Sequence, residues 1–132
     1  SMKTGTWTPT IGALNETDPT IIYTHQRGNY TKIGKMVFIS LYLRGRITAL
    51  KGTNNYACIK GIPFTAKDYA MGQQSFGIGV IYNLVTSSTD LSLGLNNQVI
   101  RVQNSYGAGA SNLKLSGNTD FEIGCSGWYE ME

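Results

Sequence analysis

The stretch from Met36 to Thr48 reads Met-Val-Phe-Ile-Ser-Leu-Tyr-Leu-Arg-Gly-Arg-Ile-Thr, and it decides the fold class. Its apolar side chains alternate onto one face, which carries Val37, Ile39, Leu41, Leu43 and Ile47. The opposite face carries Ser40, Arg44 and Arg46. A period of two residues is typical of a half-buried β-strand. Phe38 and Tyr42 share the polar face, which indicates that this face is also partly covered, for example by a neighbouring chain.

Shorter segments with strand character surround this one. Strands are predicted over residues 20–24, 28–33, 56–60, 76–82, 90–95, 98–103, 112–116 and 120–131, with turn residues such as Asn96-Asn97 between them. No window of a dozen residues carries a helical apolar stripe. The sequence therefore predicts an all-β domain, an antiparallel β-sandwich of jelly-roll type over residues 20–132. Residues 1–19 are expected to form an extended lead-in, in which Ser1-Met2 is interpreted as the remnant of a cleaved tag.

The composition supports this class and excludes others. The chain has 132 residues, of which Gly, Thr, Asn and Ser make up 50, and its net charge is +3. Low charge with ordinary hydrophobicity argues against disorder. The basic residues are scattered singly rather than clustered, so no nucleic acid is expected as a partner. No apolar stretch approaches the length of a membrane-spanning helix, and no secretory leader is visible.

The sequence offers few residues that could form a catalytic or metal-binding site. His25 is the only histidine, and we interpret it as a surface strand residue. The pairs Asp120/Glu122 and Glu130/Glu132 share strand faces, but any solvated strand gives such spacing. Cys58 and Cys125 show no metal-ligand spacing, and buried free thiols are favoured over a disulfide. No enzyme activity, metal or cofactor is therefore expected.

Carbohydrate binding has better raw material. Sugar sites combine an exposed aromatic platform with nearby hydrogen-bonding groups. Tyr and Trp together number ten, and several stand in polar or loop-like settings. The predicted ligand-binding residues are Tyr56, Tyr82, Tyr106 and Trp128, with Asn55, Asn83 and Asn104 as hydrogen-bonding neighbours. The same aromatic residues could instead pack at subunit contacts, where Tyr and Trp are also enriched.

Four short segments together resemble a known family. They are Gly5-Thr-Trp-Thr-Pro9, Gln26-Arg-Gly-Asn-Tyr-Thr-Lys-Ile-Gly34, Lys60-Gly-Ile-Pro-Phe64 and Ile123-Gly-Cys-Ser-Gly-Trp-Tyr129. Their order resembles that of the C-terminal receptor-binding domains of bacteriophage tail fibres and tailspikes. The pattern departs from that family at Ile62, where Leu is usual, and in the last segment.

The resemblance implies a homotrimer on the virion tail, made in the host bacterial cytoplasm. It also implies a non-enzymatic tip that binds a bacterial surface glycan. The alternative is a structural cap that trimerises and stabilises an upstream shaft or depolymerase without its own ligand. A polysaccharide hydrolase using Asp120 and Glu122 is a more remote third reading.

The motif residues also have structural interpretations that need no ligand. Trp7 is expected to pack against the sandwich or a neighbouring subunit. Tyr30 and Ile33 are expected in the core or at an interface. Pro63 is expected to fix a sharp turn that presses Phe64 inward.

Overall fold

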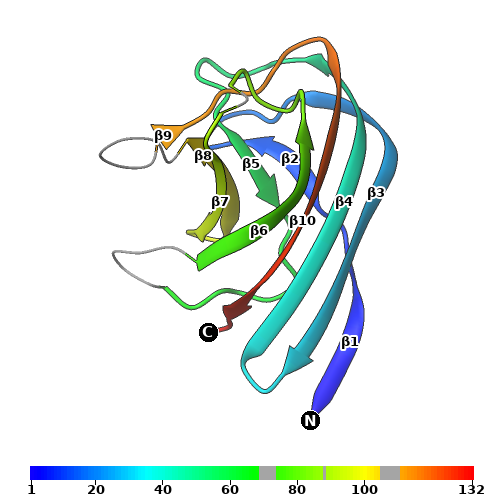
Figure 1. The fold of residues 1–132 in the computed structure, drawn as a ribbon, viewed down its shortest axis with the longest axis vertical. Helices are drawn as coiled ribbons and strands as arrows, with labels where there is room; N and C mark the ends of the chain where they lie inside the picture. Colours follow the sequence, from blue (N-terminus) through cyan, green and yellow to red (C-terminus); the bar gives the residue numbers. More distant parts are fainter. Residues whose placement is uncertain (69–73, 88, 105–110) are drawn as a thin grey trace.

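The computed structural model describes residues 1–68, 74–87, 89–104 and 111–132, and its described residues form strands and no helix. The strands are β1 (Met2–Trp7), β2 (Thr10–Ala13), β3 (Thr20–Ile33), β4 (Met36–Ala49), β5 (Ala57–Lys60), β6 (Gln74–Tyr82), β7 (Leu91–Asn96), β8 (Val99–Asn104), β9 (Ser111–Asn112) and β10 (Thr119–Glu130). Neighbouring strands pair antiparallel in the order β1-β3-β4-β10-β6-β7-β8-β5-β2, and β9 pairs with β8. The sheet curls into a half-barrel around one core (Figure 1). The prediction of an all-β domain is confirmed.

The long strand β4 lies where its sequence pattern predicts. It pairs with β3 from Met36 to Ala49 on one side and with β10 from Met36 to Ile47 on the other. Its odd-numbered residues from Val37 to Ile47 are buried, whereas Phe38, Ser40, Arg44 and Arg46 are exposed. The apolar face is the inner, concave wall of the core, and the polar face is the outer surface of the sheet. This inner–outer division governs the placement of every site residue below.

The first nineteen residues supply a strand at each end of the strand order. β1 pairs with β3, and β2 pairs with β5. In Figure 1 the chain starts beside the long strands and then crosses to the curled half of the sheet. The lead-in is therefore built into both edges of the fold, and Trp7 and Ile11 belong to the core.

The first two motif segments interlock across β1 and β3. Trp7 lies opposite Gly28 and Gly5 lies opposite Tyr30 in the strand register. Each ring covers the glycine facing it: a Cβ at residue 28 would lie 2.5 Å from the Trp7 Nε1, and one at residue 5 would lie 2.5 Å from the Tyr30 hydroxyl. Gln26 donates from Nε2 to the carbonyl of Pro9 at 2.9 Å. Only glycine leaves room for these rings, which explains the spacing of both segments.

The other two motif segments join the same cluster. Tyr30 packs edge-on against Phe64, with ring centroids 5.1 Å apart. The Tyr129 hydroxyl accepts from the Phe64 amide at 3.2 Å and donates to the Phe64 carbonyl at 2.9 Å. The buried Trp7 and the inward packing of Phe64 confirm their structural interpretations. Ile33 is exposed and faces outward at the end of β3, so it is not in the core, and an interface position stays a prediction.

Both cysteines are free and buried, as the sequence predicts. Burial raises the pKa of Cys58 to about 11 and that of Cys125 to about 12. Since the thiolate is the reactive form, both thiols are inert in the folded chain.

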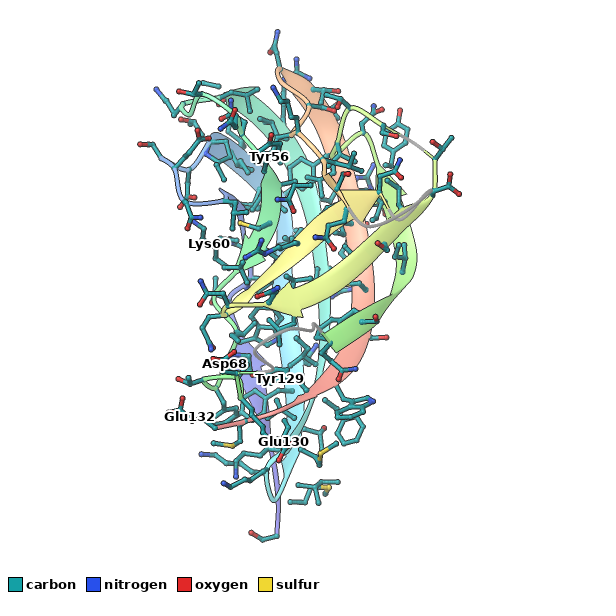
Figure 2. The ribbon with its side chains drawn as sticks, turned by 90° about the vertical axis from the view of Figure 1, so that its left-hand side faces the viewer. Tyr56, Lys60, Asp68, Tyr129, Glu130 and Glu132 are labelled. Atoms are coloured by element: carbon teal, nitrogen blue, oxygen red, sulfur yellow. The ribbon has the colours of Figure 1, made fainter. Side chains whose placement is uncertain are left out.

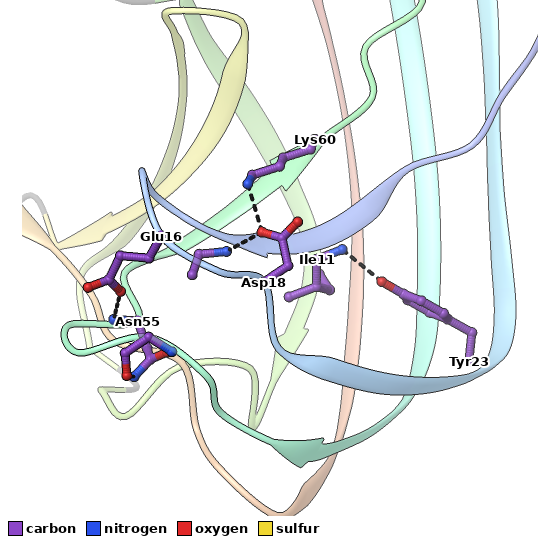
Figure 3. Close-up of polar contacts among 8 residues, drawn as sticks. Ile11, Glu16, Asp18, Tyr23, Asn55 and Lys60 are labelled. Atoms are coloured by element: carbon purple, nitrogen blue, oxygen red, sulfur yellow. Dashed lines mark hydrogen bonds and ion pairs between the residues drawn. The ribbon is translucent and has the colours of Figure 1, made fainter.

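Carboxylates hold the turn after β2 in place (Figure 3). Glu16 accepts from the backbone amides of Thr53, Asn54 and Asn55, the last at 2.7 Å. Asp18 accepts from the Ala13 amide at 3.1 Å and pairs with Lys60 at 2.7 Å. The backbone hydrogen bonds lower the pKa of Glu16 because they favour its charged form.

Replacing Glu16 with Gln is expected to lower the thermal unfolding midpoint at neutral pH. The folded-state pKa of Glu16 is lowered, so its stabilisation is present above the unfolded-state pKa and is lost as pH falls through the folded-state value. The difference between wild type and Glu16→Gln should therefore shrink on acidification. Melting curves recorded from about pH 7 to about pH 2 test this. Glu132→Gln, the same change at an exposed terminal residue, is the control. A gap that stays constant with pH would contradict the assignment.

Candidate binding cleft on the outer face of the sheet

A cleft of about 740 Å³ lies on the outer face where β3, β4, β10 and the end of β6 adjoin. These four strands run side by side in Figure 1. The lining residues are Ile22, Thr24, His25, Arg44, Gly45, Arg46, Tyr82, Asn83, Thr119, Asp120, Phe121 and Glu122. Most of them are outward-facing members of strands whose inner residues fill the core. The cleft is therefore rigidly supported from below.

The strand register sets four of these side chains in one row across the sheet. His25 of β3 pairs with Arg44 of β4, Arg44 pairs with Glu122 of β10, and Glu122 pairs with Tyr82 of β6. Neighbouring strands lie about 4.8 Å apart, so the row spans about 14 Å. A second row, formed by Ile22, Arg46 and Asp120, runs beside it.

In the second row, both terminal nitrogens of Arg46 contact neighbouring residues. Its Nη1 pairs with the Asp120 carboxylate at 3.1 Å, and its Nη2 donates to the backbone and side-chain oxygens of Asn118, each at 3.1 Å. The pair is solvent-exposed, so it adds little to stability. Its effect is to hold Asp120 and the start of β10 in a fixed position at the cleft wall.

Beside the first row, Tyr42 organises the charged residues. Its hydroxyl donates to Glu122, Arg27 lies over its ring at 5.1 Å, and the His25 ring meets it edge-on at 5.8 Å. The hydrogen bond to Glu122, followed by desolvation, raises the pKa of Tyr42, and nearby Arg44 opposes the rise. Tyr42 thus fixes the carboxylate of Glu122 on one side of Arg44.

Two of the sequence-predicted residues lie in the cleft. Tyr82 ends β6 with 57% of its surface exposed, and Asn83 follows it with a positive φ of 55°. The aromatic ring of Tyr82 stands beside the carboxylate of β10 in the first row. An exposed ring next to fixed polar groups is the combination that a sugar requires.

The other predicted residues that the structure describes do not line the cleft. Trp128 lies opposite Phe38 near the far end of β10. Tyr56 lies toward the opposite end of the molecule from Tyr129 (Figure 2), where it pairs with Lys114, and it does not line the cleft. Asn55 is only 9% exposed. Its side-chain amide accepts from the Gly52 N–H and donates to the Gly52 carbonyl, each at 2.9 Å, so it supports its own loop. Asn104 ends β8 and donates to the Thr89 carbonyl at 3.3 Å. Tyr106 lies outside the described residues.

Sequence reasoning did not assign His25, Arg44 and Arg46 to a site, and it gave Asp120 and Glu122 a role only in the more remote hydrolase reading. It placed His25 and the carboxylates on solvated strand faces, and the structure confirms that placement. The two period-two pairs, Arg44 with Arg46 and Asp120 with Glu122, were the available signal. Only the pairing of β4 with β10 shows that they face each other.

Among the described residues, no group of three or more His, Cys, Asp or Glu could hold a metal ion. The described part of the chain also contains no helix suited to crossing a membrane. No protein-family model matches this chain, and a comparison with curated proteins finds no match.

Proposed function

We propose that this domain binds a bacterial cell-surface glycan and serves as the receptor-binding tip of a phage tail fibre or tailspike. The observation that carries the proposal is the cleft, where the exposed ring of Tyr82 stands beside Asn83 and a fixed row of charged side chains. The four interlocked motif segments support the tail-protein assignment through their resemblance to that family. On this proposal the protein acts on the virion tail after synthesis in the host cytoplasm.

The arrangement of the carboxylates favours binding over cleavage. Glycoside hydrolysis needs two carboxyl groups, one of them available as a proton donor to the scissile bond. Here Asp120 pairs with Arg46, and Glu122 accepts the Tyr42 hydroxyl. Both groups are thus engaged in contacts that hold the cleft in shape.

Binding of the purified domain to host cells and to their isolated polysaccharide tests the proposal. Tyr82→Ala should weaken binding about tenfold, because the stacking platform is lost, whereas Tyr82→Phe keeps the ring and should retain most of it. Asn104→Ala, outside the cleft, is the control and should bind as wild type does. Equal binding by Tyr82→Ala and wild type would place the ligand elsewhere. Release of oligosaccharides that stops in Asp120→Asn would replace binding with hydrolysis.

The proposal includes a homotrimer, in which each subunit has the jelly-roll arrangement. The support is an apolar patch on the outer face, formed by Met2, Ile33, Phe38 and Trp128, all of them exposed. It lies at the opposite end of β4 from the cleft, about 20 Å away by strand rise. Trimerisation through this patch would leave the cleft open and add avidity to weak single sites.

Light scattering on the wild type and on Phe38→Asp tests the assembly. The wild type should have three times the mass of one chain, and the variant should be monomeric, because a buried charge at the contact is costly. A monomeric wild type at micromolar concentration would contradict the trimer. A trimer that binds no host cells or polysaccharide would favour the second candidate function, a structural cap without a ligand.

A further inference from the structure

Only one ion pair, Arg46 with Asp120, forms among the described charged side chains that line the cleft. The lining holds the cations Arg44 and Arg46 and the carboxylates Asp120 and Glu122. Arg46 forms an ion pair with Asp120 and a hydrogen bond with Asn118. Glu122 accepts a hydrogen bond from the Tyr42 hydroxyl. None of the ion pairs found among the described residues involves Arg44. The Arg44 side chain hydrogen-bonds to Tyr42, which is neutral, so its charge has no ion-pair partner in the described part of the chain and its other guanidinium donors remain available to a ligand.

The position of Arg44 suits a ligand that lies along the first row. It is exposed and stands between His25 and Glu122, with Tyr82 on the far side of Glu122. Arg27, held over the Tyr42 ring, adds a second positive charge on the same face. A guanidinium presents a planar fork of donors that matches a carboxylate and binds it through two parallel hydrogen bonds.

We propose that the cleft binds an acidic oligosaccharide, with a uronate carboxylate on Arg44 and a neighbouring sugar ring on Tyr82. This inference rests on the proposed function and names the class of glycan. The span of about 14 Å across the row accommodates a short oligosaccharide rather than a single sugar. Glu122, fixed by Tyr42, accepts hydrogen bonds from sugar hydroxyls between the two anchors.

Titration of the isotope-labelled domain, followed by amide chemical shifts, tests the proposal. The probes are oligogalacturonate, oligomeric alginate and the methyl ester of oligogalacturonate, which has the same backbone without the charge. We expect shifts at the cleft residues with the acidic probes and affinity at least tenfold lower for the ester. Binding of the acidic probes should weaken as salt is added, because the contact is charged and exposed.

Variants of Arg44 and Arg46 test which arginine binds the ligand carboxylate. Arg44→Gln should reduce affinity for the acidic probes about tenfold, the scale of one charge-assisted hydrogen-bond pair. Arg44→Lys should recover only part of it, because an ammonium lacks the fork. Arg46→Gln, the same change at the engaged arginine, is the control and should have a smaller effect.

The outcomes separate this inference from the proposed function. Equal affinity for the ester and the acid, still dependent on Tyr82, would overturn the acidic preference and leave glycan binding in place. Shifts that avoid the cleft, or no binding of either acidic probe, would overturn the inference. Host-cell binding that survives both Arg44→Gln and Tyr82→Ala would overturn the cleft as the site altogether.

Discussion

Replacing Trp7 with Ala is expected to lower the free energy of unfolding by about 3–5 kcal/mol, the usual cost of removing a large buried aromatic side chain. Trp7 is 7% exposed and covers Gly28, and its indole donates to the Asn29 carbonyl at 3.2 Å. The residue beneath the ring is glycine, which has no side chain to occupy the space that the substitution leaves. The loss would be a large part of the stability of an ordinary domain. Guanidinium denaturation followed by circular dichroism measures it.

The second tryptophan provides the matched control. Trp128 is 40% exposed on the outer face, so Trp128→Ala should change the stability of the monomeric chain by less than about 1 kcal/mol. Both variants should be measured at a protein concentration low enough to keep the chain monomeric. Similar losses in the two variants would mean that the cluster of motif segments is not the anchor that its contacts indicate.

Replacing Gly45 with Ala is expected to cost about 3 kcal/mol or more, because the added methyl group would meet backbone rather than a movable side chain. The new Cβ would lie 2.1 Å from the Ile22 carbonyl oxygen and 3.0 Å from the Tyr23 Cα. The register of β3 against β4 shifts here, between Tyr23 and His25. The β-bulge brings β3 so close to β4 that only glycine fits.

The same substitution at Gly77 of β6 is the control. A Cβ there would have no contact shorter than 3.6 Å, so Gly77→Ala should be close to neutral or slightly stabilising. Because Gly45 separates Arg44 from Arg46 at the floor of the cleft, Gly45→Ala should also weaken glycan binding. A Gly45→Ala protein as stable as Gly77→Ala would contradict the close approach of β3 to β4.

Stability and binding depend on opposite faces of the same strands. Val37, Leu43 and Ile47 face the core, whereas Arg44 and Arg46 face the cleft. Changes at Tyr82 or Arg44 should therefore alter binding with little effect on the unfolding midpoint. Changes at Trp7 should instead lower the unfolding midpoint without removing a ligand contact. Comparing the two kinds of variant therefore distinguishes a folding defect from the loss of a ligand contact.

The sequence by itself determined the all-β class, the inner and outer faces of β4, the burial of the two cysteines and the inward packing of Phe64. These properties are local: alternation with a period of two, turn residues and side-chain hydrophobicity are readable within a few neighbouring residues. The four motif segments could be recognised in the same way, although their contacts with one another could not.

The tertiary structure alone decided the strand order and the cleft. His25, Arg44, Glu122 and Tyr82 come from four strands, and a shift of one residue in any pairing would turn a side chain to the other face. Sequence separation carries no information about that register, so Tyr82 and Asn83 could be predicted singly but their charged neighbours could not. The fold also places Asn55 and Trp128 outside the cleft. Hydrogen bonds with Gly52 hold Asn55 in its own loop, and the direction of β10 puts Trp128 at the far end of that strand.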